Sequence, residues 1–221
     1  MVKAAGMHNK KDYNIIQSHY PYIYANHLLY TLLMRLLYGR FFKSRYQAIC
    51  DLIPHGANVV DVCSGDCLLY QKFLRKKKVN YLGLDSSPHF VNCARKLGVN
   101  SILFDVWGKK FPPADYLIMQ ASLYQFIPYE QMIIEKLLDS SKKKVLVAEP
   151  IRNLSDSRFI LISKLSHRLT KQKSKGDVHT SNRFNHKKLM RVFRSFTEFE
   201  SCFPIPGGRE MIGIFKGRLG K

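Results

Sequence analysis

The chain has 221 residues, of which 46% are hydrophobic, and a formal net charge of +20. This length and composition fit one α/β core, and no apolar run approaches the roughly 18–20 residues of a membrane-spanning helix. The basic start has no apolar stretch after it, so we expect no signal peptide. Five irregularly spaced cysteines argue against a disulfide framework and for a cytoplasmic protein; without a Cys/His cluster we expect no metal.

The positive charge lies on the flanks of the chain. Residues 1–50 carry a net +6, residues 51–141 a net +1, and residues 142–221 a net +13. Such a distribution favours an anionic partner, which could be nucleic acid, an anionic membrane surface or a phosphorylated substrate. A basic surface that only keeps the protein soluble explains the excess equally well.

The first 50 residues are rich in aromatic and aliphatic side chains, and we expect them to form a helical cap. From residue 57 onward, short apolar runs alternate with stretches of helical spacing. Strands are predicted at 57–62, 79–85, 100–105, 115–120 and 143–149, and helices at 68–76, 89–98 and 129–141. Continuous apolar strands of this kind indicate a parallel sheet covered by helices on both faces.

The last part of the chain changes character. It is predicted to contain an amphipathic helix (157–169), a polar basic loop (170–182) and a second helix (186–195). Two strand-like segments, 196–205 and 209–217, flank Gly207-Gly208 and predict an antiparallel hairpin at the edge of the sheet. No linker divides the chain, so we expect one domain, 1–221, made of a cap (1–50), a core (51–150), an insertion (151–195) and an edge hairpin (196–217).

Acidic residues follow three successive strands of the predicted βαβαβ series. VVDVCSGDC (59–67) runs from Asp61 into a turn of small residues around Gly65, and small residues there let a ligand approach the backbone. Asp85 ends the second strand, where a carboxylate can accept both hydroxyls of a ribose. Asp105 ends the third, where it can accept from the exocyclic amine of adenine. The set predicts a nucleoside-binding site.

In these residues the sequence resembles the class I S-adenosylmethionine-dependent methyltransferases, of the type that acts on small molecules and lipids. VVDVCSGDC is similar to the family's first motif, hh[DE]hGxGxG with h apolar, and Cys63 and Cys67 stand in place of the outer glycines. GLDSSPHFVNCAR looks like the second motif, and FDVWGKKFPPADYLIMQASLYQF like the third and fourth. The likeness spans roughly residues 55–217.

The resemblance implies a three-layer, Rossmann-like α/β fold: a seven-stranded, mostly parallel sheet with a C-terminal antiparallel hairpin and a helical N-terminal cap. It also implies S-adenosylmethionine as cofactor. The cofactor-binding residues would be Asp61, Cys63, Ser64, Gly65, Cys67, Asp85, Ser86, Asp105, Val106, Gln120 and Ala121. A dinucleotide enzyme would need G-x-G-x-x-G for its pyrophosphate, whereas this cofactor has no phosphate and tolerates the two cysteines. We expect both cysteines to be packing residues.

The candidate catalytic residues lie in the cap and after the fourth strand. Tyr13 and Tyr20 resemble the Y-D-x-x-A-x-x-Y opening of small-molecule and lipid methyltransferases, in which the tyrosines lie over the methionine end of the cofactor. Packing in the core would explain their spacing as well. His19 is a candidate base and Tyr124 a candidate contact of the acceptor. Arg152 and Arg183 are candidates to receive an anionic group of the substrate, although surface positions suit both.

The expected function is methyl transfer to a small molecule, with lipid or quinone-like acceptors included. The charge supports an RNA methyltransferase as the alternative, but the N-P-P-[YF] motif and a separate RNA-binding module are not found. A non-catalytic cofactor-binding or interaction domain is a further alternative, against which the three aspartates argue. Basic, aromatic helices at 25–45 and 157–170 would suit an anionic membrane surface, so the expected localisation is cytoplasmic with peripheral membrane attachment open.

Overall fold

A computed structural model describes residues 32, 35, 38–108, 110–151 and 183–220, and the structural statements below refer to these. Several predictions fall outside the described residues. They are the first part of the cap, the helix at 157–169, the loop at 170–182, and the residues Tyr13, His19, Tyr20 and Arg152.

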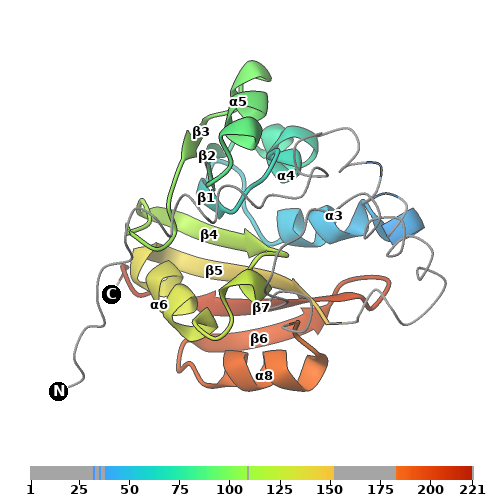
Figure 1. Cartoon of the computed structure of the whole chain (residues 1–221), viewed down its shortest axis with the longest axis vertical. Coiled ribbons are helices and arrows are strands. Elements are labelled where there is room, and N and C mark those ends of the chain that lie inside the picture. The colour runs from blue at the N-terminus through green and yellow to red at the C-terminus, as the bar shows by residue number, and fades with distance from the viewer. Residues whose placement is uncertain (1–31, 33–34, 36–37, 109, 152–182, 221) are drawn as a thin grey trace, which may run out of the picture.

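Seven strands form one sheet in the order β3-β2-β1-β4-β5-β7-β6, with β3 at one end and β6 at the other (Figure 1). The strands are β1 (Asn58–Val62), β2 (Asn80–Asp85), β3 (Ser101–Leu103), β4 (Ala114–Gln120), β5 (Ser141–Pro150), β6 (Phe199–Pro204) and β7 (Glu210–Lys216). Strands β1 to β5 pair in parallel, and β7 pairs antiparallel with both β5 and β6. The predicted sheet and its C-terminal hairpin are therefore confirmed.

The helices are α3 (Ser44–Asp51), α4 (Leu68–Lys72), α5 (Pro88–Lys96), α6 (Glu130–Ser140) and α8 (His186–Arg194), with 3-10 turns η2 (Gly39–Phe41), η3 (Leu74–Lys77) and η4 (Leu123–Phe126). Side chains cap two of them, since Ser87 accepts from the N–H of Phe90 and Asn185 from the N–H of Lys188. No helix in this part of the chain is long and apolar enough to cross a membrane.

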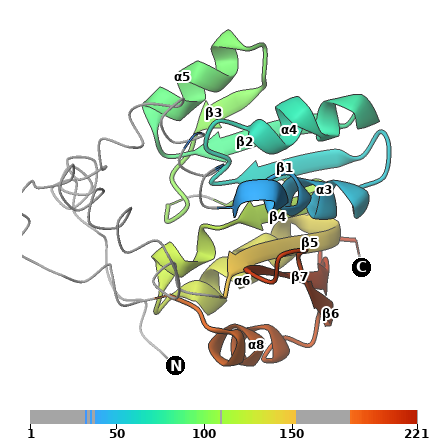
Figure 2. The ribbon, with the colours of Figure 1, turned by 90° about the vertical axis from the view of Figure 1, so that its right-hand side faces the viewer.

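Both faces of the sheet are apolar, because alternate residues of each central strand point to opposite sides. In β4, Leu117 and Met119 belong to the core on the side of α6 and α8, whereas Ile118 belongs to the core on the side of α3, α4 and α5. Helix α8 lies next to the β6–β7 hairpin in both views (Figure 1, Figure 2). The arrangement has three layers, as predicted.

Two predicted elements are shorter in the structure. The helix expected at 68–76 ends at Lys72, since Phe73 leaves the helical conformation and stacks its ring on Tyr46 of α3. The strand expected at 100–105 ends at Leu103. Its neighbour β2 ends at Asp85, directly opposite Leu103, and the N–H of Phe104 makes the last bond to this strand, to the carbonyl of Asp85 at 2.9 Å. Asp105 therefore lies in the loop beyond β3.

Candidate active site

The turn between β1 and α4 has an unusual backbone. Cys63, Gly65 and Cys67 have φ values of +58°, +54° and +57°. This left-handed region costs residues other than glycine roughly 1–2 kcal/mol each. Two backbone hydrogen bonds hold the turn. The N–H of Ser64 donates to the carbonyl of Leu84 at 3.0 Å, and the N–H of Cys67 donates to the carbonyl of Ser64 at 2.9 Å. Cys63 and Cys67 thus adopt the left-handed conformation that is easiest for glycine, the residue of the family motif at these two positions.

A glycine in β2 leaves room for this turn. A Cβ on Gly83 would lie 2.7 Å from Sγ of Cys67 and 2.8 Å from Oγ of Ser64. Cys67 is fully buried and its thiol lies 3.4 Å from the Ser64 hydroxyl. Burial raises the pKa of the Cys67 thiol to about 11, so it remains a neutral thiol at physiological pH. The side chain of Cys67 fills space beneath the turn.

Asp85 holds the same turn from the end of β2. Its Oδ2 accepts from the N–H of Gly65 at 2.8 Å, and its Oδ1 accepts from the N–H of Ser87 at 2.8 Å. A carboxylate has about four acceptor positions, so acceptor capacity remains for a ligand's hydroxyl while these backbone bonds persist. Burial raises the pKa of Asp85, and the backbone N–H groups of Ser87, Gly65 and Ser86 act in the opposite direction. Ser86 follows directly at the same edge.

Asp61 lies beneath the turn and is only 4% exposed. Its Oδ2 accepts from the hydroxyl of Tyr81 at 2.8 Å, and Tyr81 in turn stacks on Tyr70. Burial raises the pKa of Asp61 to about 7, the Tyr81 bond lowers it, and the nearby Asp85 and Asp66 carboxylates raise it. Asp61 thus ties β1 to β2 through Tyr81, two residues before Cys63 of the turn.

Sequence reasoning missed Asp66, a buried residue at the start of α4. Its Oδ1 accepts from the N–H of Leu68 at 3.1 Å. An aspartate just before a helical stretch is an ordinary helix-start signal and could have identified it.

The ends of β3 and β4 bring further predicted residues to this edge. Asp105 is half-buried, its Oδ1 accepts from the N–H of Trp107 at 2.9 Å, and the neighbouring Val106 is buried. Gln120 ends β4, and its amide donates to the carbonyl of Arg45 at 3.3 Å. Ala121 has φ of +52° and donates its N–H to the carbonyl of Ala148 at 2.7 Å.

The turns after β1 and β4 meet because these two strands are neighbours. Burial raises the pKa of the Cys63 thiol well above its usual range, while a hydrogen bond with Ser122 acts in the opposite direction. Tyr124 follows in η4, half-buried, with the Arg183 guanidinium 5.0 Å from its ring centroid. The structure thus gathers the described cofactor candidates and Tyr124 at one edge of the sheet.

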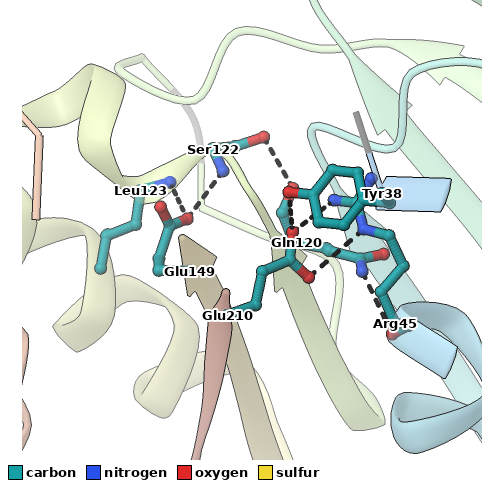
Figure 3. A network of polar contacts seen from close by, with 7 residues as sticks. All are labelled: Tyr38, Arg45, Gln120, Ser122, Leu123, Glu149 and Glu210. Atoms are coloured by element: carbon teal, nitrogen blue, oxygen red, sulfur yellow. Dashed lines mark hydrogen bonds and ion pairs between the residues drawn. The ribbon is translucent and has the colours of Figure 1, made fainter. Parts of the chain in front are cut away.

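A buried ion pair joins α3 to the same edge, and sequence reasoning did not find it (Figure 3). Arg45 and Glu210 are 3% and 1% exposed, with Nη2 of Arg45 2.8 Å from Oε1 of Glu210 and Nε 3.3 Å from Oε2. The Tyr38 hydroxyl donates to Oε1 of Glu210, and the Arg45 guanidinium lies 4.2 Å from the Tyr38 ring centroid. The pair anchors the described end of the cap to β7.

Glu149, at the end of β5, is a second buried acid that was missed. Its Oε1 accepts from the N–H groups of Ser122 and Leu123 at 2.7 Å and 2.6 Å (Figure 3). Burial raises the pKa of Glu149 to about 8, against the effect of these N–H donors. An acid that directly borders an apolar run, as in VLVAEP and REMIGIF, is the signal that could have revealed both Glu149 and Glu210.

In the part of the chain that the structure describes, no three His, Cys, Asp or Glu side chains come together in a way that could hold a metal ion. The five cysteines are free thiols.

The family model described as methionine biosynthesis protein MetW matches residues 43–187. A search of curated protein sequences finds no significant match. Similar solved structures include a TehB-like SAM-dependent methyltransferase from Corynebacterium glutamicum, with 13% identity, a TM-score of 0.52, and coverage of 79% of this chain and 88% of that one.

A second similar structure is the magnesium protoporphyrin IX methyltransferase from Synechocystis with bound S-adenosylhomocysteine, with 12% identity, a TM-score of 0.59, and coverage of 94% and 100%. A third is an O-methyltransferase family 2 protein from Planctomyces limnophilus in complex with apigenin, with 15% identity, a TM-score of 0.59, and coverage of 85% and 60%. At these identities the likeness shows a shared fold, and the class I methyltransferase resemblance seen in the sequence is confirmed.

Proposed function

This chain belongs to the MetW family and is a class I S-adenosylmethionine-dependent methyltransferase, and on this premise we propose that it methylates a small-molecule acceptor, lipids and quinone-like compounds included. Bound S-adenosylmethionine would supply an electrophilic methyl group to a nucleophilic atom of the acceptor and would leave as S-adenosylhomocysteine. The acceptor loses its proton to a base or to water. Positioning supplies much of the rate, so the residues that shape the pocket matter most.

The observation that carries the proposal is the turn after β1, held between Asp85 and Gly83. Its left-handed backbone follows the first strand, and Asp85 binds it while keeping acceptor positions for a ribose. The turn lacks the three glycines that let a phosphate approach the backbone in dinucleotide-binding loops. It therefore suits a cofactor that carries no phosphate. Asp105 and Val106 lie one strand further, on the side proposed for adenine.

For the acceptor we propose a place beside Tyr124, on the side of the turn after β4. Two structural neighbours support a small molecule, since one is a magnesium protoporphyrin IX methyltransferase and another binds apigenin. Arg183, stacked on the Tyr124 ring, would favour an acceptor with an anionic group. Attachment to an anionic membrane from the cytoplasm remains part of the proposal for a lipid acceptor.

Calorimetry with S-adenosylmethionine and S-adenosylhomocysteine tests the cofactor. Transfer of a tritiated methyl group to three acceptor pools then tests the substrate class: soluble metabolites, lipid vesicles and bulk RNA. We expect label in one of the first two pools. Label in RNA would establish the RNA methyltransferase alternative. Cofactor binding without label in any pool would favour a non-catalytic cofactor-binding domain, and an absence of cofactor binding would favour an interaction domain.

A further inference from the structure

We infer that Glu149 is a positioning residue, whose carboxylate fixes the turn after β4 (residues 120–124) on which the acceptor side of the active site is built. The expected effect of Glu149 on catalysis rests on the proposed function. The contacts of Glu149 do not depend on which acceptor is methylated.

Within the described part of the chain, the hydrogen bonds of the Glu149 side chain go to this turn. One carboxylate oxygen accepts from two successive N–H groups, those of Ser122 and Leu123 (Figure 3). The N–H of Tyr124 is a third donor near the carboxyl group. The side chain is 0% exposed, so a ligand at the sheet edge does not touch it. Glu149 can therefore act only through the backbone that it holds.

The turn needs such an anchor because its backbone is strained. Ala121 has φ of +52°, a conformation that a residue with a side chain keeps only where its surroundings impose it. Strand β5 supplies both restraints: the carbonyl of Ala148 accepts from the N–H of Ala121, and Glu149 binds the next two N–H groups. The hydroxyl of Ser122 adds a bond to the carbonyl of Gln120 at 3.1 Å.

A shift of this turn would reach both sides of the site. Ser122 contacts the Cys63 thiol of the first turn. At the other end of η4, the ring of Phe126 packs edge-on against Trp107 with centroids 5.4 Å apart, and the N–H of Trp107 is bound by Asp105. Glu149 thus sets the position of a segment that touches the turns after β1 and β3 as well as Tyr124.

The chain contains a single tryptophan, Trp107, whose fluorescence reports the position of η4. Glu149→Gln keeps an oxygen that can accept from the two N–H groups, whereas Glu149→Ala leaves them buried without an acceptor. We expect Glu149→Ala to change the Trp107 emission and to weaken S-adenosylhomocysteine binding by about tenfold, while Glu149→Gln stays within about threefold of wild type. If Glu149→Ala does not fold, Glu149→Asp, which withdraws the carboxylate by one methylene, should show the same changes.

Ile53→Ala is the matched control, because Ile53 is fully buried in the core on the face of the sheet opposite to Leu123 and Phe126 of η4. It should lower the unfolding midpoint without changing the Trp107 emission or the affinity of the folded protein. The same behaviour in Glu149→Ala would show a merely structural role and overturn the inference. A wild-type protein that fails to bind S-adenosylhomocysteine would refute the proposed function instead, and the Trp107 response of Glu149→Ala would still test the positioning.

Discussion

The two edges of the parallel sheet are built in different ways. At the carboxyl edge, Cys63, Cys67 and Ala121 adopt left-handed conformations, and the Arg45–Glu210 pair lies buried. At the amino edge, by contrast, two asparagines on neighbouring strands are exposed. Asn58 and Asn80 face each other in register and share a hydrogen bond of 3.0 Å, and Lys78, a residue other than glycine with positive φ, is exposed there.

The difference indicates which edge performs the function. Backbone strain and buried charge each cost on the order of a kcal/mol or more, and they persist where the surrounding structure imposes them and where a site uses them. The amino edge follows local rules and needs no such explanation. This contrast can be tested with variants that change a strained or buried charged residue at the carboxyl edge. Each is compared with a matched variant at the amino edge.

The largest effect is expected for the buried ion pair. Arg45→Met leaves Glu210 buried without its cation, which should lower the free energy of unfolding by about 3–5 kcal/mol in denaturant titrations. Replacing both partners, as Arg45→Met with Glu210→Gln, should recover much of that loss. The control is the amino-edge pair of Lys143 and Asp115, 3.6 Å apart with Lys143 58% exposed, where Lys143→Met should cost less than about 0.5 kcal/mol. Equal losses at both edges would contradict the contrast.

The next effect concerns the cofactor. Asp85→Ala removes the acceptor proposed for the ribose hydroxyls together with the bond to the N–H of Gly65. At 1–2 kcal/mol or more for each hydrogen bond to a charged group, we expect S-adenosylhomocysteine binding to weaken by about 2–4 kcal/mol in calorimetry. Asp115→Ala, at the amino edge, should bind as wild type does. An unchanged affinity for Asp85→Ala would remove this residue from the site.

The buried acids also predict how stability depends on pH. Burial raises the pKa of Glu149 from 4.5 to about 8 and that of Asp61 from 3.8 to about 7. At pH values between the unfolded and the folded pKa of each acid, the folded state keeps a proton that the unfolded chain has released. The free energy of unfolding therefore falls as the pH rises through this range and levels off above it. We expect a decrease on the order of 1–3 kcal/mol between pH 5 and 8.

Denaturant titrations of the ligand-free protein at several pH values measure this slope. Glu149→Gln should flatten it, because the amide does not titrate, whereas the exposed Glu135→Gln should leave it as in wild type. A slope that Glu149→Gln does not alter would mean that Glu149 is not protonated in the folded protein at neutral pH.

Most of the sheet could be predicted from the sequence, because continuous apolar runs report burial on both faces directly. The same is true of Asp61, Asp85 and Asp105, since each follows such a run and parallel strands bring their carboxyl ends together. The β6–β7 hairpin carries its own local signal in Gly207-Gly208. These features depend on neighbours in the sequence.

The features that escaped prediction depend on residues far apart in the sequence. Arg45 and Glu210 are 165 positions apart, and Glu149 binds N–H groups 26 and 27 positions away. Neither contact has a periodicity that a single sequence could reveal. The left-handed backbone of Ala121 is likewise imposed by β5, since alanine has no local preference for it.

The smallest predicted effect returns to the two cysteines of the first turn. Cys63→Gly removes the cost of a left-handed residue but makes the unfolded chain more flexible, so we expect a net gain of about 0–1 kcal/mol in stability with S-adenosylhomocysteine affinity preserved or tightened. Cys67→Gly also loses a fully buried thiol, so its gain should be offset and its net effect close to zero. Lys78→Gly, at the amino edge with φ of +50°, should bring the stability gain of Cys63→Gly without any change in affinity. If Cys63→Gly instead weakens binding, the thiol itself contacts the cofactor and the strain at this edge serves to present it.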